Sequence, residues 1–241
     1  MACGTQVVPG YKEFNAKMKQ HGGKDPALET KLNQLMLESE RRKSQFKAGV
    51  ISSSEYALST KDIKYRRDNP DLIEDTNEYF HGTSTPIKDV GYSGGEKNIY
   101  GSGLYTTMNN GVAYKYTKKG KGTQPIVYKI IETNPGPSLN LETTPASFGK
   151  EMLGEEYNNE WFEGKSLREA LDEYRDDSQG FGIPAWEVKE NIDTIFDKAY
   201  RQGYKSVSHY GGRLTGGVKH RVKIFTHPAD DIKLKQVSNP K

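Results

Sequence analysis

The sequence has almost no cysteine and no long apolar run. Its 241 residues contain one cysteine, Cys3, which excludes a disulfide within the chain and a cysteine-rich zinc site. No stretch approaches the roughly 20 consecutive apolar residues that a membrane-spanning helix needs. The N-terminal residues also lack the apolar segment of a Sec-type signal peptide. We therefore expect a protein with no metal and no membrane partner that works in a cytoplasm.

Apolar residues are scarce overall, and the charges are unevenly distributed. Hydrophobic residues make up 33% of the chain and charged residues 28%, which predicts a small core with long polar loops. Residues 1–70 carry 13 Lys and Arg against 8 Asp and Glu, and residues 150–200 carry 6 against 14. Residues 205–241 are basic again, with 8 against 2. This asymmetry permits a basic face for nucleic acid or an acidic partner, although solvated helix faces are the simpler explanation.

The N-terminal third predicts a flexible stretch, 1–24, followed by a helical hairpin, 25–70. Asp25 and Pro26 form a good helix start, because a capping residue precedes proline at the first helical position. Gly49 ends this helix, and residues 52–67 predict a second helix. Apolar positions of the first helix recur with helical spacing at Leu28, Leu32, Leu35 and Met36.

Residues 71–241 predict one domain of the α+β class, built on a compact sheet. Expected strands cover 78–83, 103–107, 125–131, 206–210, 220–226 and 232–237, with a helix at 109–116. An acidic helical insertion is expected at about 146–202, interrupted near 180–184. No G-x-G-x-x-G motif follows a strand, which argues against a dinucleotide-binding Rossmann domain.

Three short segments carry the chemical signal. His81, Gly82 and Thr83 end the first expected strand. A Gly-Ser-Gly-Leu-Tyr segment, 101–105, follows, with Tyr105 placed 24 residues after His81. The third segment runs from Ala113 to Tyr116, which lies 11 residues after Tyr105. Each segment alone is a weak signal, since a lone histidine on a strand or a Gly-x-Gly turn is usually structural, but their order and spacing are more specific.

This pattern resembles the diphtheria-toxin/PARP-like branch of the ADP-ribosyltransferases, in particular members encoded by phages and mobile elements. The resemblance covers residues 79–131 well, extends loosely to 203–233 and does not include 1–70. It implies the split β-sheet core of that family, with NAD+ as co-substrate and ADP-ribose passed to a protein or nucleic acid. It also implies a toxin-like or effector role, in the host cytoplasm for a phage or secreted protein.

The resemblance assigns a role in holding NAD+ to each motif residue. His81 would donate a hydrogen bond to a ribose hydroxyl, and the backbone of Gly82 would approach the carboxamide closely, since glycine has no Cβ. Tyr105 and Tyr116 would lie against the cationic nicotinamide ring, a contact worth about 0.5–2 kcal/mol. The remaining residues that the resemblance places at the cofactor are Thr83, Gly103 and Ala113.

The sequence lacks the glutamate that family members usually carry at the start of a late strand. The matching stretch, 215–225, contains no acidic residue, and His220 or Arg221 stands nearest the expected place. We therefore expect transfer of single ADP-ribose units, with His220 and Arg221 as catalytic candidates beside His81 and Tyr105. Acids of the insertion that could replace the glutamate are Glu155, Glu156 and Glu160.

Two other readings stay open. A catalytically inactive member of this fold, used as a binding or virion-associated protein, would explain the missing glutamate. An RNA 2′-phosphotransferase also uses a His-Gly motif and NAD+, but it would carry an Arg-x-x-His-type motif where residues 104–107 stand. The acceptor cannot be read from the residues, and the basic hairpin leaves nucleic acid open beside protein.

Overall fold

The computed structural model describes residues 26–73, 78–90, 100–118, 124–153, 165–180, 182–211 and 219–237. The expected flexible N-terminus, 1–24, lies outside the described residues. Helices are α2 (Pro26–Lys47), α3 (Ser53–Asp68), the short 3-10 helix η1 (Pro70–Leu72), α4 (Asn110–Thr117), α5 (Ser147–Leu153), α6 (Leu167–Gly180), α7 (Ala185–Arg201) and α8 (Pro228–Asp231). Strands are β1 (Tyr79–Thr83), β2 (Leu104–Thr107), β3 (Ile126–Glu132), β4 (Ser138–Asn140), β5 (Ser206–Gly211), β6 (His220–Phe225) and β7 (Ile232–Val237).

The seven described strands form one mixed sheet in the order β4-β5-β6-β2-β1-β3-β7. Neighbouring strands are antiparallel, except that β4 runs parallel to β5. The α+β class expected from the sequence is thus confirmed. The strands expected along the chain are present as well, while β4 is an additional short strand at one edge.

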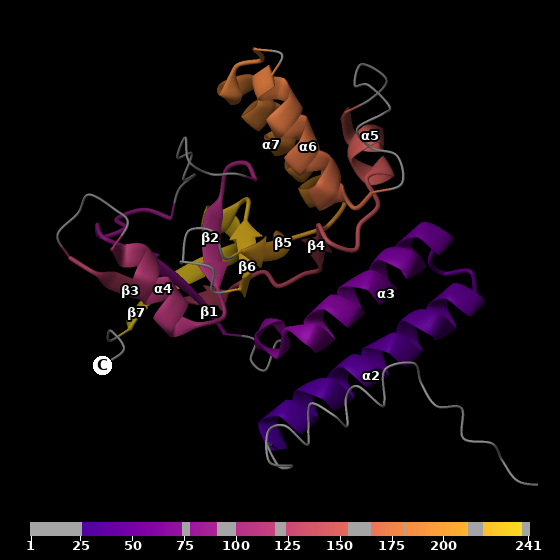
Figure 1. The fold of residues 1–241 in the computed structure, drawn as a ribbon. Coiled ribbons are helices and arrows are strands. Elements are labelled where there is room, and N and C mark those ends of the chain that lie inside the picture. The colour runs from indigo at the N-terminus through magenta and orange to yellow at the C-terminus, as the bar shows by residue number, and fades with distance from the viewer. Residues whose placement is uncertain are drawn as a thin grey trace, which may run out of the picture.

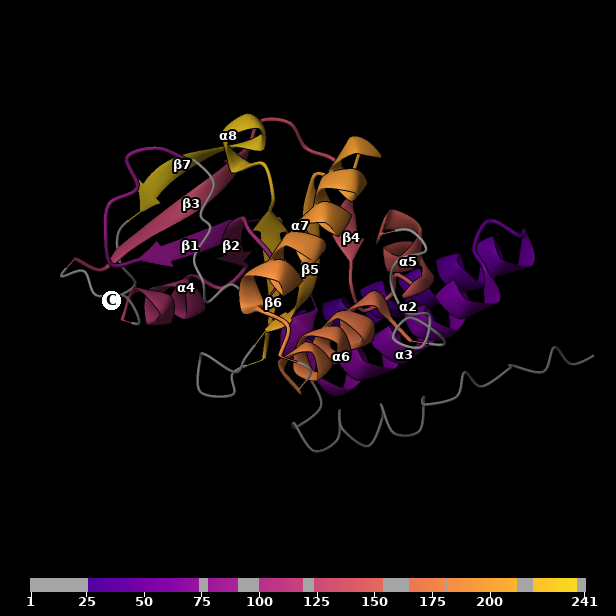
Figure 2. The same cartoon turned by 90° about the horizontal axis from the view of Figure 1, so that it is seen from above.

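Helices cover both faces of the β4-β5-β6 half of the sheet (Figures 1 and 2). The acidic insertion supplies α5, α6 and α7, and these helices pack on one face. The hairpin of α2 and α3 lies on the other. The largest apolar cluster joins α6 and α7 to the sheet through side chains such as Ile195, Phe196 and Ile224. A second cluster, around Tyr79 and Phe225, lies on the opposite face of the central strands.

The hairpin forms as its sequence predicts. Gly49 adopts a positive φ of 69° in the turn after α2, a conformation that glycine accepts without strain. Ser52 caps α3 in a capping box with Glu55. Leu32 and Leu35 of the expected stripe are buried in a small cluster, but Met36 is 50% exposed. The buried contact of the hairpin therefore covers Leu32 and Leu35, with Leu28 and Ile63 packed against them, and does not extend to Met36.

Among the described helices, none combines the length and the apolar character that crossing a lipid bilayer requires. The described residues also contain no group of three or more His, Cys, Asp or Glu side chains placed to hold a metal ion.

Candidate active site

The motif strands β1 and β2 stand side by side but pair at one position only. Phe80 opposes Thr107, and in the described strands the ladder does not continue toward Thr83. Beyond this pair a side chain bridges the two strands, because Nδ1 of His81 lies 2.8 Å from the carbonyl oxygen of Tyr105. Burial lowers the pKa of His81, so the ring is neutral at physiological pH and Nδ1–H donates to the carbonyl. The sheet is thus opened between the first two motifs, with His81 at the junction.

Gly82 is required by the helix that crosses it. A Cβ on this residue would lie 1.7 Å from the carbonyl oxygen of Ala113, which is fully buried in α4. The first and third motifs are therefore in direct backbone contact. This close approach explains the glycine and the small residue at position 113 without any ligand, so a Gly82 variant would disturb α4 whatever the pocket binds.

Helix α7 holds the Gly-Ser-Gly turn before β2. One carboxylate oxygen of Asp193 accepts from the backbone N–H of Ser102 at 2.5 Å, and the other accepts from its hydroxyl at 2.8 Å. Lys189 donates to the same hydroxyl at 2.6 Å and also pairs with Asp193. Gly103 has a φ of +144°, and a Cβ there would meet the carbonyl oxygen of Phe225 at 2.7 Å. The insertion thus anchors the loop that carries the second motif.

The hydroxyl of Tyr105 is hydrogen-bonded to the backbone of the loop before β2. It donates to the carbonyl of Gly101 at 2.9 Å and accepts from the N–H of Tyr100 at 3.1 Å. Burial strongly raises the pKa of Tyr105, so the phenol stays protonated. The half-buried ring packs against the cluster under α7. Only the ring, and not the hydroxyl, can therefore contact a ligand.

The third motif meets strand β6 at His220. The hydroxyl of Tyr116 lies 3.1 Å from Nε2 of His220, and the two rings meet edge to face. Burial raises the pKa of Tyr116, so the phenol keeps its proton, and it donates to Nε2 in the tautomer of His220 that carries its proton on Nδ1. His220 is itself buried and packs closely on Gly211 of β5. This geometry suits His220 to positioning Tyr116, since Nε2 is already engaged with the phenol.

Arg221 lies apart from this group. Successive residues of a strand point to opposite faces of a sheet, so Arg221 turns away from His220. Its guanidinium donates to the hydroxyl of Ser208 at 3.2 Å and lines a cavity beside the hairpin. Thr83 is also separate, because its hydroxyl bonds the backbone of Thr85 in the loop after β1. The structure therefore joins six of the expected residues in three pairs: His81 with the backbone of Tyr105, Gly82 with that of Ala113, and Tyr116 with His220. Gly103, a seventh, lies directly before the start of β2.

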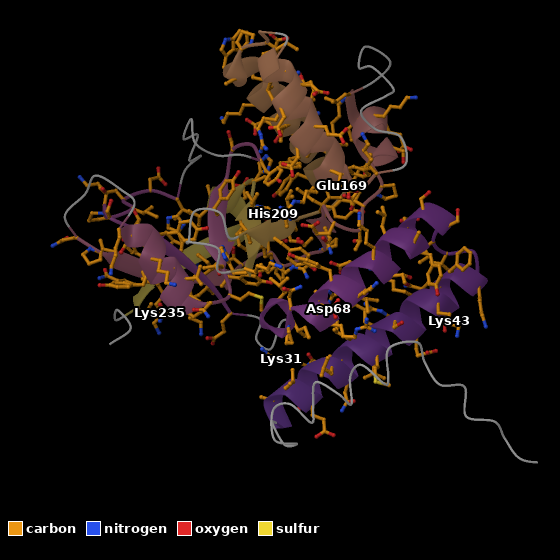
Figure 3. The ribbon with its side chains drawn as sticks, viewed as in Figure 1. Lys31, Lys43, Asp68, Glu169, His209 and Lys235 are labelled. Carbon is orange, nitrogen blue, oxygen red and sulfur yellow. The ribbon has the colours of Figure 1, made fainter. Side chains whose placement is uncertain are left out.

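Sequence reasoning did not single out His209, which lies on the same face of the sheet as His220. Its ring is 4.4 Å from that of Tyr100, and its Nδ1 lies 3.0 Å from the carbonyl of Tyr210. The other nitrogen, Nε2, is buried with no partner among the described residues. Figure 3 labels His209 among the side chains of the sheet. Burial lowers the pKa of His209 to about 3. The alternation of β5 was the only signal that could have placed it there.

Two acids near these strands are already engaged. Asp193 holds the Gly-Ser-Gly turn, and Glu142 accepts from the N–H of Tyr210 at 3.0 Å while pairing with Arg168. Burial raises the pKa of Glu142 despite the charge of Arg168. The expected replacement acids Glu155, Glu156 and Glu160 lie outside the described residues.

Comparison of the chain with protein-family models, with curated proteins and with solved structures finds no match. The assignment of function therefore depends on the residues and geometry of the site alone.

Proposed function

We propose that this protein is a mono-ADP-ribosyltransferase, which cleaves NAD+ and transfers ADP-ribose to a protein or nucleic acid. The observation that carries the proposal is the convergence of the three motifs on the opening between β1 and β2. His81 bridges the two strands there, and Ala113 seats α4 directly on Gly82. The split-sheet fold of the diphtheria-toxin/PARP-like family, which would place the nicotinamide in this opening, is part of the same proposal.

The residues around the opening fit a flat, cationic ring held by its amide. Gly82 has no register partner on β2 in the described strands, while on its other side it pairs with Val127 of β3. Tyr116 is half-buried, and its ring is held at the edge by His220. An aromatic face stabilises a cationic ring by about 0.5–2 kcal/mol. Because Nδ1–H of neutral His81 donates to the carbonyl of Tyr105, Nε2 can accept from a sugar hydroxyl, which reverses the direction expected from the sequence, and it adds no positive charge next to the nicotinamide.

The proposed reaction breaks the bond between C1′ of the ribose and the nicotinamide nitrogen, and the bonding electrons leave with neutral nicotinamide. An oxygen or nitrogen of the acceptor forms the new bond to C1′ and gives up its proton. The transition state resembles an oxocarbenium ion, which family members normally stabilise with the missing carboxylate. We place His220 as a positioning residue for Tyr116, and we infer that the acceptor supplies its own base or a strong nucleophile.

The decisive test is nicotinamide release from NAD+ by the purified chain, with and without a cell lysate as the source of acceptor. Tyr116→Ala should reduce release at least about tenfold, because it removes the face on which the ring rests. Tyr114→Ala is the matched control: it removes a tyrosine from the same helix that lies against Lys118 instead of His220. Equal loss in both variants would point to damage of α4 and not to a pocket.

Two variants of His220 test its positioning role. Gln can still accept from the Tyr116 hydroxyl and Ala cannot, so His220→Gln should keep most of the release activity while His220→Ala loses it. If the two variants are equally inactive, His220 acts on the reaction itself and the positioning role is wrong. Mass spectrometry should show one ADP-ribose per modified site, and ribose–ribose linkages would contradict mono-transfer.

A non-catalytic binding protein of the same fold is the second candidate. Two facts favour it: Tyr116 and His220 already bond each other, and position 220 carries a histidine instead of a carboxylate. Such a protein would still be stabilised thermally by nicotinamide but would release none from NAD+. Thermal stabilisation by nicotinamide, measured together with nicotinamide release from NAD+, therefore separates the two functions.

A further inference from the structure

One buried histidine, His209 of β5, carries a hydrogen-bond acceptor that no donor meets. His209 is only 7% exposed. Its Nδ1 lies 3.0 Å from the carbonyl oxygen of Tyr210, and a carbonyl can only accept, so Nδ1 carries the proton. Burial lowers the pKa of His209 to about 3, so the ring is neutral and Nε2 is a bare acceptor. Within the part of the chain that the structure describes, no donor lies at hydrogen-bond distance from Nε2.

A buried polar atom without a partner is rare in folded proteins, because it loses its bonds to water and gains nothing in return. The neighbouring hydroxyl of Tyr100 does not complete Nε2. The ring of Tyr100 lies 4.4 Å from the ring of His209, but its hydroxyl donates to Asp172 at 2.6 Å. An apolar side chain of similar size would avoid the loss at this position. The unmet acceptor therefore indicates a place where a ligand can donate a hydrogen bond.

The strand register places His209 next to the motif residues. Thr107 on β2 opposes Val222 on β6, and Val222 in turn opposes His209. Opposed residues of antiparallel strands share a face, so these three side chains form one row across the sheet. On the same face, the row on one side holds Tyr105 and the row on the other side holds His220. The row of His209 therefore runs between the second motif and the residue that meets the third.

His209 is also the diagonal neighbour of His220. Gly211 opposes His220 and lies two residues after His209 on β5. Diagonal neighbours of an antiparallel pair lie about 7–8 Å apart, so both can contact the same small ligand. The ring of Tyr116, against which we place the nicotinamide, meets His220 edge to face. A sugar joined to that nicotinamide is therefore within reach of His209.

The surroundings of His209 select a neutral donor. Burial is the main reason that a positive charge is disfavoured here, and the charges of Arg168, His220 and Arg221 act in the same direction. A lysine ammonium would meet the same penalty, whereas a hydroxyl can donate to Nε2 without bringing a charge into the site. A sugar hydroxyl satisfies this requirement.

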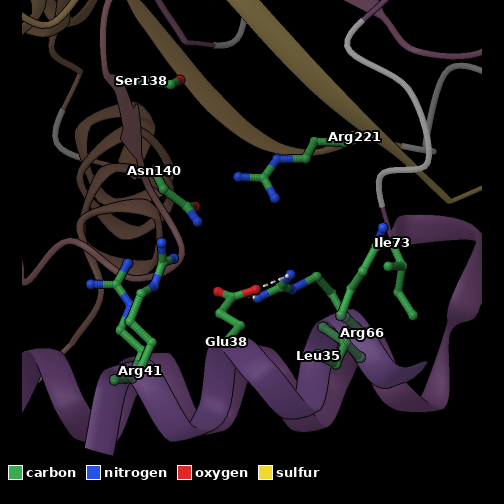
Figure 4. A pocket seen from close by; sticks show the side chains of 10 residues that line it. Leu35, Glu38, Arg41, Arg66, Ile73, Ser138, Asn140 and Arg221 are labelled. Atoms are coloured by element: carbon green, nitrogen blue, oxygen red, sulfur yellow. Dashed lines mark hydrogen bonds and ion pairs between the residues drawn. The ribbon is translucent and has the colours of Figure 1, made fainter. Parts of the chain in front are cut away.

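The cavity beside the hairpin belongs to the other face of the sheet. Arg221 opposes Tyr210, the residue after His209, and Figure 4 shows its side chain directed from β6 toward the hairpin. Since successive residues of a strand point to opposite faces, a ligand at His209 does not occupy that cavity.

We propose that Nε2 of His209 binds a hydroxyl of the ribose that carries the nicotinamide. The inference rests on the proposed function, because it takes Tyr116 as the residue against which the nicotinamide lies. The hydroxyl donates to Nε2 and completes the buried acceptor, and no covalent bond forms or breaks. His81 is on β1, three strands from β5, which is about 14 Å at 4.8 Å per strand. One ribose does not span that distance, so His81 would bind a hydroxyl of the second ribose of NAD+.

The test compares two compounds that differ by the ribose alone, nicotinamide and nicotinamide riboside. Their affinities for the full chain are measured by calorimetry, and the melting temperature of each variant shows whether the fold is intact. If Nε2 binds the ribose, removal of Nε2 should weaken binding of the riboside about five- to tenfold, the effect of one hydrogen bond. Binding of nicotinamide should stay unchanged.

His209→Asn and His209→Gln separate the two nitrogens of the ring. Asparagine retains an N–H near the position of Nδ1 but has no atom at Nε2, whereas glutamine is long enough to place its amide oxygen there. We therefore expect His209→Asn to lose the contribution of the ribose and His209→Gln to keep most of it. His227→Asn is the control, because that histidine stacks on Tyr200 at 3.9 Å beyond the other end of β6. It should leave both affinities unchanged.

Selective weakening of riboside binding in His209→Asn, with recovery in His209→Gln, supports the proposal. Equal riboside binding by the parent chain and His209→Asn would overturn it, as would an equal loss of nicotinamide binding or the absence of binding by both compounds. Nicotinamide release from NAD+ is measured separately. A chain that binds the riboside through His209 but releases no nicotinamide contradicts only the transferase activity, and normal release with unaltered riboside binding in His209→Asn contradicts only the role of His209.

Discussion

The two faces of the sheet are covered by helices of opposite chemistry. Helix α7 buries Val188, Ile192, Ile195, Phe196 and Ala199 against one face. Helix α3 buries Ser59, Asp62 and Arg66, all polar, on the other side. Asp62 accepts from the hydroxyl of Tyr210 on β5 and from Arg66 beside it.

This difference determines how well each face tolerates substitution. An apolar contact tolerates many side chains of similar volume, because burial of apolar area has no preferred direction. A buried polar contact requires every donor and acceptor to keep its partner. The α7 face therefore supplies stability to the loop of the second motif, while the α3 face depends on specific partners such as Asp62 with Tyr210 and Arg66.

Truncation of a buried side chain on the apolar face should cause the largest loss of unfolding free energy. Phe196→Ala removes a fully buried ring from the main cluster and should lower the free energy of unfolding by about 3–5 kcal/mol. Trp186→Ala removes an equally large ring from the same helix, but that ring is 62% exposed. Chemical denaturation should show that the Trp186 variant loses less than about 1 kcal/mol. Comparable losses would mean that α7 is not held by its buried stripe.

Truncation on the polar face should lower the free energy of unfolding less, and through unsatisfied hydrogen bonds instead of a cavity. Asp62→Ala leaves the Tyr210 hydroxyl and one side of Arg66 without an acceptor, at a cost of about 2–3 kcal/mol. Arg66 keeps Glu38, which limits the damage. Asp176→Ala, at an exposed pair on α6, should change stability by less than about 0.5 kcal/mol in the same denaturation experiment. A neutral result for Asp62 would show that this interface is not held by its hydrogen bonds.

Acidification should lower the stability of the folded chain through the buried His209. Burial lowers the pKa of His209 to about 3 in the folded chain, whereas an unfolded histidine titrates near 6.5. Below about pH 6 the unfolded chain binds a proton that the folded chain refuses, so this contribution to stability is present above pH 6.5 and declines as the pH falls. The slope from His209 is about 1.4 kcal/mol per pH unit. Burial lowers the pKa of His81 as well, which adds to the decline.

Denaturation of His209→Gln between pH 7 and pH 5 checks this point, since glutamine does not titrate. Its stability should fall less steeply with acid than that of the parent chain. An unchanged slope would show that His209 is accessible to protons in the folded state.

The smallest expected effect lies at the far end of the hairpin. Ser52→Ala removes the capping box of α3 and should lower the free energy of unfolding by about 1 kcal/mol. Ser53→Ala, one residue into the helix and exposed, is the control and should be nearly neutral. If Ser52→Ala lowers the free energy of unfolding much more than Asp62→Ala does, the hairpin depends on its own helix ends more than on its contact with the sheet.

The local elements could be predicted because their signals are local. The helix start at Pro26, the turn at Gly49 and the alternation of the six expected strands each depend on a few neighbouring residues. The missed strand β4 is three residues long and pairs with β5 across 68 positions of the chain, so no nearby residue indicates it. The exposure of Met36 could not be predicted, because spacing defines a stripe but not the width of the contact that covers it.

The sequence by itself determined the α+β composition of the chain, the order of the three motifs and the absence of an acid at position 220. Only the tertiary structure decided which of two adjacent residues, His220 and Arg221, meets Tyr116. The reason is that a shift of one residue along a strand exchanges the two faces of a sheet, and the partners on those faces come from distant helices. The same placement put four arginines around one cavity, from segments separated by about 180 residues, where no sequence spacing could have joined them.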